Sequence, residues 1–211
     1  MTFNTFLNLI EFYTGNKNWF SNSKLSLNQK EIVDLIHTNK YSVIYKSRQD
    51  GVSTVLSLYL LWRMVETPGI TIGLLSHLGA REIFRQNVNW NLSNLKLGYK
   101  THNVDRTILT NGSQIFYLSG QYPNALRGLS LDIIVLDDLL DEERDGFLVD
   151  SILTTASREC GKIIISTSGN AIKDDVNLRF DSNINFQEIY GHFFNGKRQV
   201  LIEKFKEHKK S

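Results

Sequence analysis

The chain has 211 residues, 41% of them hydrophobic, and this length and composition predict one medium-sized domain with a real core. Its formal net charge of +2 is too small to require nucleic acid as a partner, although it leaves room for a local basic face. The single cysteine excludes an internal disulfide, and the absence of a membrane-length apolar run or a signal-like N-terminus predicts a soluble cytosolic protein.

Two helices are predicted before residue 40. The first comes from apolar residues at helical spacing between Phe3 and Ile10. It either covers an edge of the core or serves as a lid or docking segment. The second begins at a cap on Ser26 or Asn28. Gln29, just inside it, is either a surface polar residue or an adenine contact, because a glutamine amide offers one donor and one acceptor.

A short strand, a polar loop and a helix follow one another between Tyr41 and Trp62, which is the layout of a P-loop. The loop departs from the usual Gly-x4-Gly-Lys-Ser/Thr pattern, because Lys46 replaces the first glycine and Val52 the lysine. Backbone N–H groups at a helix start bind phosphate whatever the side chains are. Lys46 can bring its ammonium to the same phosphates, and Ser53 supplies the hydroxyl that binds Mg²⁺ in this pattern.

Further strands and helices alternate after this loop. Residues 70–76 are predicted as a buried strand, and Gly79–Leu95 as a long helix. Residues 100–118 predict a β-hairpin, since an Asn-Gly pair separates two apolar runs. The order favours an α/β fold with a mainly parallel sheet flanked by helices, with the hairpin as an addition.

Two later strands end in polar residues. The apolar run Leu131–Leu136 leads into Asp137 and Asp138, which downstream of a P-loop is a Walker B pattern. The first carboxylate of this pattern holds Mg²⁺, and the second orients or deprotonates the attacking water. Without a P-loop upstream, the same residues would be interpreted as a strand followed by a charged turn. Residues 162–166 form the other strand, and the small polar loop after it can sense the γ-phosphate.

The signals weaken after residue 170. Upstream of that point, a helix is expected at Gly146–Arg158, between the predicted strands at 131–136 and 162–166. Residues 186–194 are predicted as either a strand or a docked helix. The basic end at 204–210 is either a solvated tail or a DNA contact.

Taken in order, several segments together resemble the ATPase domain of the large terminase subunit of tailed phages, the motor that pumps DNA into a procapsid. These segments are Gln29, Lys46–Thr54, Asn124–Gly128, Asp137-Asp138 and Ser166–Asn170. The resemblance covers about residues 25–170. It implies a P-loop NTPase fold, with 1–40 as an adenine-side segment, 41–170 as the core and 171–211 as an extension. The family usually continues into an RNase H-like nuclease, whereas 1–211 is expected to be a single domain without nuclease activity.

The resemblance also implies ATP and Mg²⁺ as ligands. Gln29 resembles the family's adenine-contacting glutamine, and Lys46 the displaced lysine of variant Walker A motifs. The implied metal ligands are Ser53 and Asp137. The implied nucleotide-binding set is Gln29, Lys46, Ser47, Arg48, Gln49, Asp50, Gly51, Val52, Ser53, Thr54, Ser166 and Thr167.

Three residues have implied catalytic roles. Asp138 occupies the place of the family's catalytic glutamate and is one methylene shorter. A cation must offset the charge of the transition state. In related chemistry, arginine fingers raise kcat by about 10³- to 10⁵-fold. Arg48 in cis and Arg127 in trans are the two candidates. Action in trans would need a ring of subunits, so an isolated monomer should be slow.

The implied function is ATP hydrolysis that drives double-stranded viral DNA into a procapsid in the host cytoplasm. Its implied partners are DNA, the portal of the procapsid, a small terminase subunit, further copies of the chain in a ring, and a separately encoded nuclease. No membrane partner is expected. Two alternatives stay open. One is a helicase-like or recombination ATPase, and the other is a degenerate nucleotide-binding assembly protein, which the atypical lysine and the aspartate in place of glutamate favour.

Overall fold

The computed structural model describes residues 1–7, 25–46, 51–120, 126, 128–138, 161–168 and 187–190. Within them, one eight-stranded sheet has the order β3-β4-β5-β2-β6-β7-β1-β8. The strands are β1 (Tyr41–Lys46), β2 (Thr71–Ser76), β3 (Tyr99–His102), β4 (Arg106–Leu109), β5 (Gln114–Ser119), β6 (Ile133–Asp137), β7 (Lys162–Ser168) and β8 (Gln187–Tyr190). The helices are α2 (Leu27–Thr38), α3 (Val52–Glu66) and α4 (Leu78–Asn94). Residues 3–7 are also helical.

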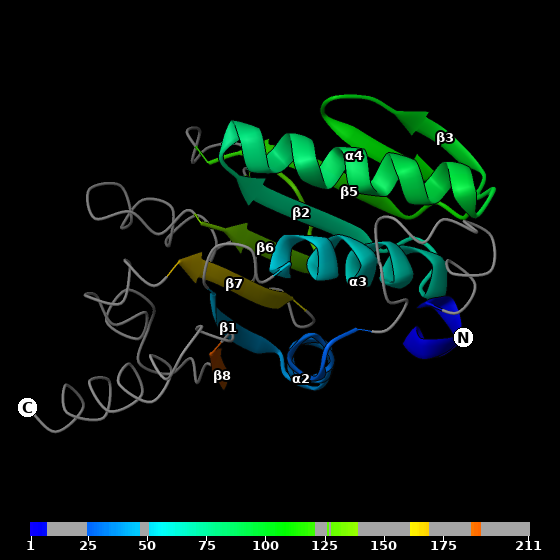
Figure 1. Ribbon diagram of the computed structural model, residues 1–211. Coiled ribbons are helices and arrows are strands. Elements are labelled where there is room, and N and C mark those ends of the chain that lie inside the picture. Colours follow the sequence, from blue (N-terminus) through cyan, green and yellow to red (C-terminus); the bar gives the residue numbers. More distant parts are fainter. Residues whose placement is uncertain are drawn as a thin grey trace, which may run out of the picture.

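The sheet is mainly parallel, as the sequence predicted. The neighbouring strands from β5 across to β8 all run parallel, and β4 and β3 continue the sheet in antiparallel pairing (Figure 1). Strands β4 and β5 form the predicted hairpin, and Gly112 in its turn has φ +87°. Every residue of β6 is buried, as expected for a parallel strand with neighbours on both sides.

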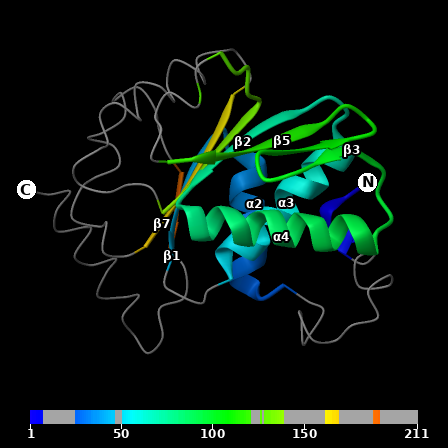
Figure 2. The ribbon, with the colours of Figure 1, turned by 90° about the horizontal axis from the view of Figure 1, so that it is seen from above.

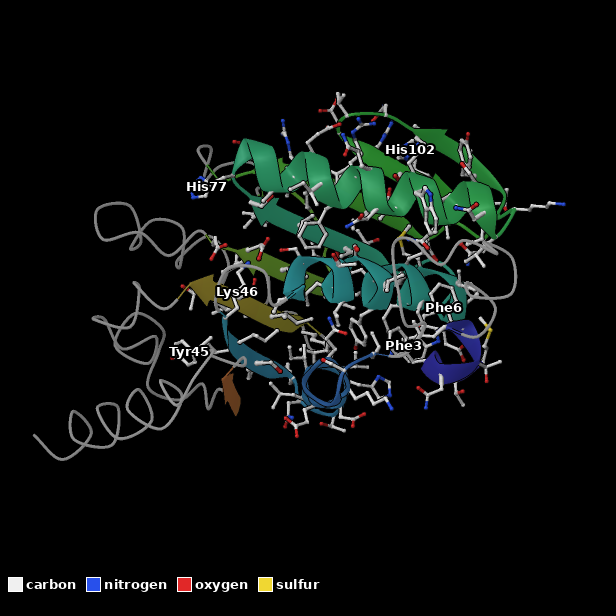
Figure 3. The ribbon with its side chains drawn as sticks, viewed as in Figure 1. Phe3, Phe6, Tyr45, Lys46, His77 and His102 are labelled. Atoms are coloured by element: carbon white, nitrogen blue, oxygen red, sulfur yellow. The ribbon has the colours of Figure 1, made fainter. Side chains whose placement is uncertain are left out.

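Helices α3 and α4 lie side by side over one face of this sheet (Figures 1 and 2). The first helical residues of the chain dock on α3. The Phe3 ring lies 5.4 Å from the Trp62 ring, and the indole nitrogen of Trp62 donates to the Met1 carbonyl at 3.0 Å. Phe6 is buried beside them (Figure 3). These contacts favour the interpretation that the N-terminal segment covers an edge of the core.

Two strand predictions are sharpened by the structure. Strand β6 begins at Ile133, two residues after the expected start at Leu131, and Asp132 just before it contacts Thr71, the first residue of β2. The Asp132 carboxylate accepts the Thr71 N–H at 2.8 Å, and the Asp132 N–H donates to the Thr71 carbonyl at 2.8 Å. In the segment 186–194, residues Gln187–Tyr190 form a strand, β8, parallel to β1. The predicted helix at 146–158 and the basic end at 204–210 lie outside the described residues.

Lys162 holds the C-terminal end of α2 against the start of β7. Its ammonium donates to the carbonyl of Ile36 at 2.6 Å, of His37 at 3.3 Å and also of Asn39. The last carbonyls of a helix lack partners within the helix and favour a cation. Burial, and then the nearby Arg63, lower the pKa of Lys162 to about 8. Lys162 therefore has a structural role. It lies where the parallel strands begin, and Lys46 and Asp137 lie where they end.

Replacing Lys162 by methionine is expected to lower the free energy of unfolding by about 1–3 kcal/mol, because it leaves helix carbonyls unpaired. Urea denaturation measures this difference. Lys30→Met is the matched control, since Lys30 is exposed on the same helix, and its effect should stay within about 0.5 kcal/mol. Equal losses in the two variants would contradict the assigned role.

Candidate functional site

Charged and hydroxyl side chains gather where the parallel strands end. Strand β1 ends at Lys46 and β6 at Asp137 (Figure 3 labels Lys46). Strand β7 lies between them, with Ser166 in register with Asp137 and Ser168 in register with Lys46. The strand of the predicted phosphate loop and the strand of the predicted metal carboxylate are therefore not neighbours. Ligands of open α/β sheets bind at this edge.

Lys46 forms ion pairs with both carboxylates of the predicted Walker B motif. Its ammonium lies 2.5 Å from Asp137 Oδ1 and 2.9 Å from Asp138 Oδ2. The side chains of Lys46 and Asp137 are only 9% and 1% exposed. Burial by itself lowers the pKa of Lys46, but Asp137 and then Asp138 outweigh it, and the pKa ends above its usual value. Lys46 is therefore a cation at neutral pH.

Asp137 is the centre of this cluster. Besides Lys46, its Oδ1 accepts a hydrogen bond from the Ser166 hydroxyl, and its Oδ2 accepts one from the Ser53 hydroxyl at 3.1 Å. The two predicted metal ligands, Ser53 and Asp137, are thus in direct contact. Both are oxygen donors, which Mg²⁺ prefers, so these residues fit the metal that the motif implies.

The start of α3 offers backbone N–H groups that can bind an anion. Gly51 is its N-cap, in the left-handed region at φ +69°, and no described side chain caps the helix. The first N–H groups of a helix have no partner within it, and the helix dipole favours negative charge there. Val52, Ser53 and Thr54 form this first turn. The rest of the predicted loop, 47–50, lies outside the described residues.

Gln29 lies beside this loop. A Cβ atom at Gly51 would stand 2.9 Å from Gln29 Nε2. The Oε1 atom of Gln29 accepts the Ser26 N–H at 3.1 Å, while the Ser26 hydroxyl accepts the Gln29 N–H at 3.2 Å. This capping box settles Ser26 as the cap and engages one side of the amide. The adenine contact of Gln29 stays a prediction.

Gly51→Ala is expected to lower the free energy of unfolding by about 1–2 kcal/mol, because alanine is strained at positive φ. The close approach of Gln29 Nε2 adds to this cost. Gly79→Ala is the control, since a Cβ at that position of α4 meets no atom within 4 Å. It should stabilise the protein by up to about 1 kcal/mol, as alanine favours a helix. Thermal denaturation distinguishes the two, and equal stability would refute the argument.

Asp138 has an unusual backbone and a carboxylate that the described residues satisfy on one side only. Its φ is +53°, a region that aspartate tolerates better than most residues. Its N–H donates to the Ser166 carbonyl at 2.8 Å, which fixes this turn after β6. Oδ2 contacts Lys46, whereas Oδ1 is buried and has no hydrogen-bond partner among the described residues. Strained residues and unpaired buried polar atoms cluster at functional sites.

Not every predicted residue joins the cluster. Ser166, expected in the nucleotide-binding set, does join it, because its hydroxyl donates to Asp137. Thr167 is buried in register with Tyr45 of β1. The predicted catalytic arginines, Arg48 and Arg127, lie outside the described residues. Sequence reasoning missed the contact between Lys46 and Asp137, although the shared edge of a parallel sheet could have suggested it.

No protein-family model and no curated protein matches the chain. Solved structures of phage proteins do match in fold. The large terminase ATPase domain of Thermus phage P74-26 has a TM-score of 0.60 at 16% identity, over 86% of this chain and 87% of that chain. The large terminase of bacteriophage HK97 has a TM-score of 0.66 at 13% identity, over 100% of this chain and 52% of its own.

A large terminase from a thermophilic bacteriophage, in complex with ADP, matches with a TM-score of 0.58 at 14% identity. This match covers 87% of the chain and 50% of the ADP-bound terminase. The chain therefore spans about half the length of the HK97 protein and of the ADP-bound terminase. Identities this low bear on fold alone. The chain has the P-loop NTPase fold of the ATPase domains of phage large terminases.

Proposed function

We propose that this chain hydrolyses ATP as the ATPase part of a viral DNA-packaging terminase. The observation that carries the proposal is the convergence of Lys46, Ser53, Asp137 and Asp138 at one edge of the sheet, beside the start of α3. The fold of the phage ATPase domains supports it, and so does the ADP complex of the terminase from a thermophilic bacteriophage.

In this proposal the phosphates of ATP lie on the loop between Lys46 and Thr54. The N–H groups of the first turn of α3 would donate to phosphate oxygens, and Lys46 would add its positive charge. In this proposal, the nucleotide-binding set also includes Ser47, Arg48, Gln49 and Asp50. Gln29 would contact the adenine through Nε2, because its Oε1 is engaged in the capping box.

Ser53 and Asp137 would hold Mg²⁺. When bound, this ion would offset charge on the phosphoryl group that is transferred. Magnesium is commonly held by one or two protein oxygens together with substrate phosphates, which matches a site made of one hydroxyl and one carboxylate. The hydroxyl of Ser166 holds Asp137 in place from the neighbouring strand.

Asp138 would position the attacking water. Its buried Oδ1 has no donor among the described residues and can accept a water proton, while Oδ2 is held by Lys46. A carboxylate in this role contributes about 10²- to 10⁴-fold. Arg48 in cis or Arg127 in trans would stabilise the charge that develops, and action in trans would require a ring of subunits.

The proposed partners are double-stranded DNA, the portal of a procapsid, a small terminase subunit, further copies of the chain and a separate nuclease, in the host cytoplasm. No helix in the described part of the chain is long and apolar enough to cross a membrane.

An ATPase assay of the purified chain, alone and with procapsids and double-stranded DNA, tests the proposed function. We expect slow Mg²⁺-dependent hydrolysis by the chain alone, stimulation by DNA and procapsids, and no turnover in EDTA. Nucleotide binding without turnover in every mixture would instead favour the assembly protein. Unwinding of duplex DNA by the chain would favour a helicase.

A further inference from the structure

We propose that Lys46 competes with the divalent metal for Asp137, so that the site accepts the metal only together with a nucleotide. The inference rests on the proposed function for the identity of the ligand pair, a divalent cation and a nucleoside triphosphate. It assigns Lys46 a second role besides contact with phosphate, which is to keep the carboxylates from binding metal alone.

The hydrogen bonds of Asp137 leave little room for a metal. A carboxylate offers about four lone-pair positions. Lys46 and Ser166 both donate to Oδ1, and Ser53 donates to Oδ2. The Asp137 side chain is 1% exposed, so no solvent-facing oxygen is left over. A metal that reaches Asp137 must replace one of these donors or lie close to the ammonium of Lys46.

The charges of the site also disfavour binding of the metal without a nucleotide. Asp137, Asp138 and Lys46 together carry one net negative charge, whereas the two carboxylates alone would carry two. A doubly charged cation is attracted by the carboxylates and repelled by the ammonium. These forces are strong here because Lys46 and Asp137 are buried and water screens them weakly.

A nucleotide removes the competition. Its phosphates, bound at the start of α3, offer Lys46 another set of negative oxygens. Lysine has a long flexible stem, and Lys46 is the last residue of β1, so the ammonium can move while the strand stays paired. Once Lys46 contacts phosphate, Asp137 is free for the metal. Metal and nucleotide should therefore raise each other's affinity.

The test is metal binding without nucleotide, measured by Mn²⁺ electron paramagnetic resonance and by the shift of Tm with Mn²⁺. Wild type should bind Mn²⁺ weakly. Lys46→Met should bind it about tenfold more tightly or better, because the repelling charge is gone. Loss of Lys46 also leaves both carboxylates without their cation and destabilises the protein. Mn²⁺ should restore much of that loss in the variant and shift the Tm of wild type little.

Three further variants make the result specific. Lys46→Arg keeps the charge and should bind Mn²⁺ as weakly as wild type. Lys46→Gln removes the charge but can still donate to Asp137, so it should gain binding as Lys46→Met does. The double variant Lys46→Met, Asp137→Asn should lose the gained binding, which assigns the metal to Asp137.

The competition is refuted if the methionine and glutamine variants bind Mn²⁺ no more tightly than wild type, since Lys46 would then be a structural partner of Asp137 only. A methionine variant that stays unfolded at every Mn²⁺ concentration refutes it too, because metal should replace the lost charge. A different result would refute the proposed function but not the competition. In that case wild type neither binds nor hydrolyses ATP, while the Lys46 variants still bind Mn²⁺ more tightly than wild type.

Discussion

Asp137→Asn is expected to reduce kcat for Mg²⁺-dependent ATP hydrolysis by about 10³-fold or more, because it removes the charge on which the metal depends. Lys46, Ser53 and Ser166 all donate to the two oxygens of Asp137, whereas asparagine keeps only one acceptor oxygen and puts an N–H donor group in place of the other. The buried ammonium of Lys46 also loses its nearest counter-ion. Breaking a buried ion pair in this way costs about 3–5 kcal/mol of stability.

A coupled assay for ADP release, run well below the Tm of the variant, separates lost activity from lost folding. Asp132→Asn is the matched control, since Asp132 flanks the opposite end of the same strand and accepts the Thr71 N–H. This control should hydrolyse ATP as wild type does. Wild-type activity in Asp137→Asn would show that the metal is held elsewhere.

Asp138→Asn is expected to lower kcat by about 10²- to 10⁴-fold and to leave nucleotide affinity close to that of wild type. An amide cannot take the proton of the attacking water. Asparagine adopts positive φ as readily as aspartate, so the turn after β6 should keep its shape at φ +53°. Steady-state kinetics gives kcat, and a fluorescent ATP analogue gives the affinity.

Lys96→Asn is the control for placing asparagine at a position with positive φ. Lys96 is the other non-glycine residue with positive φ among the described residues, at +51°, and it is exposed at the end of α4. Its substitution should leave kcat unchanged. A retained kcat in Asp138→Asn would point to another carboxylate, such as Glu142 or Glu143, as the group that orients water.

Local patterns in the sequence were enough for most elements. The run from Tyr41 to Trp62 predicted a strand, a loop and a helix, because apolar β-type residues, a lone glycine and an uninterrupted apolar stretch follow one another. Asn111-Gly112 predicted the hairpin, since this pair favours a tight turn with positive φ. These signals depend on residues that are close together in the sequence, so a single sequence is enough to detect them.

The order of the strands could not be predicted in this way. Placing β7 between β1 and β6 depends on pairing between distant segments, and Lys46 is 91 residues from Asp137. Nothing local to Lys46 indicates that its partner is a buried carboxylate. The capping box at Ser26 and Gln29 was missed for another reason. The Ser-x-x-Gln spacing indicates it, but Gln29 was interpreted only as an adenine contact or a surface residue.

The position of β1 bears on how the protein folds. Among the described strands, β2 pairs with β5 and β6, which follow within one stretch of chain, whereas β1 pairs with β7 and β8, which come much later. Closing long loops is slow because their entropy is lost before distant contacts form. During synthesis, β1 must wait unpaired until β7 has left the ribosome. Lys46 meets Asp137 only then, so the proposed catalytic site is among the last parts of the molecule to assemble.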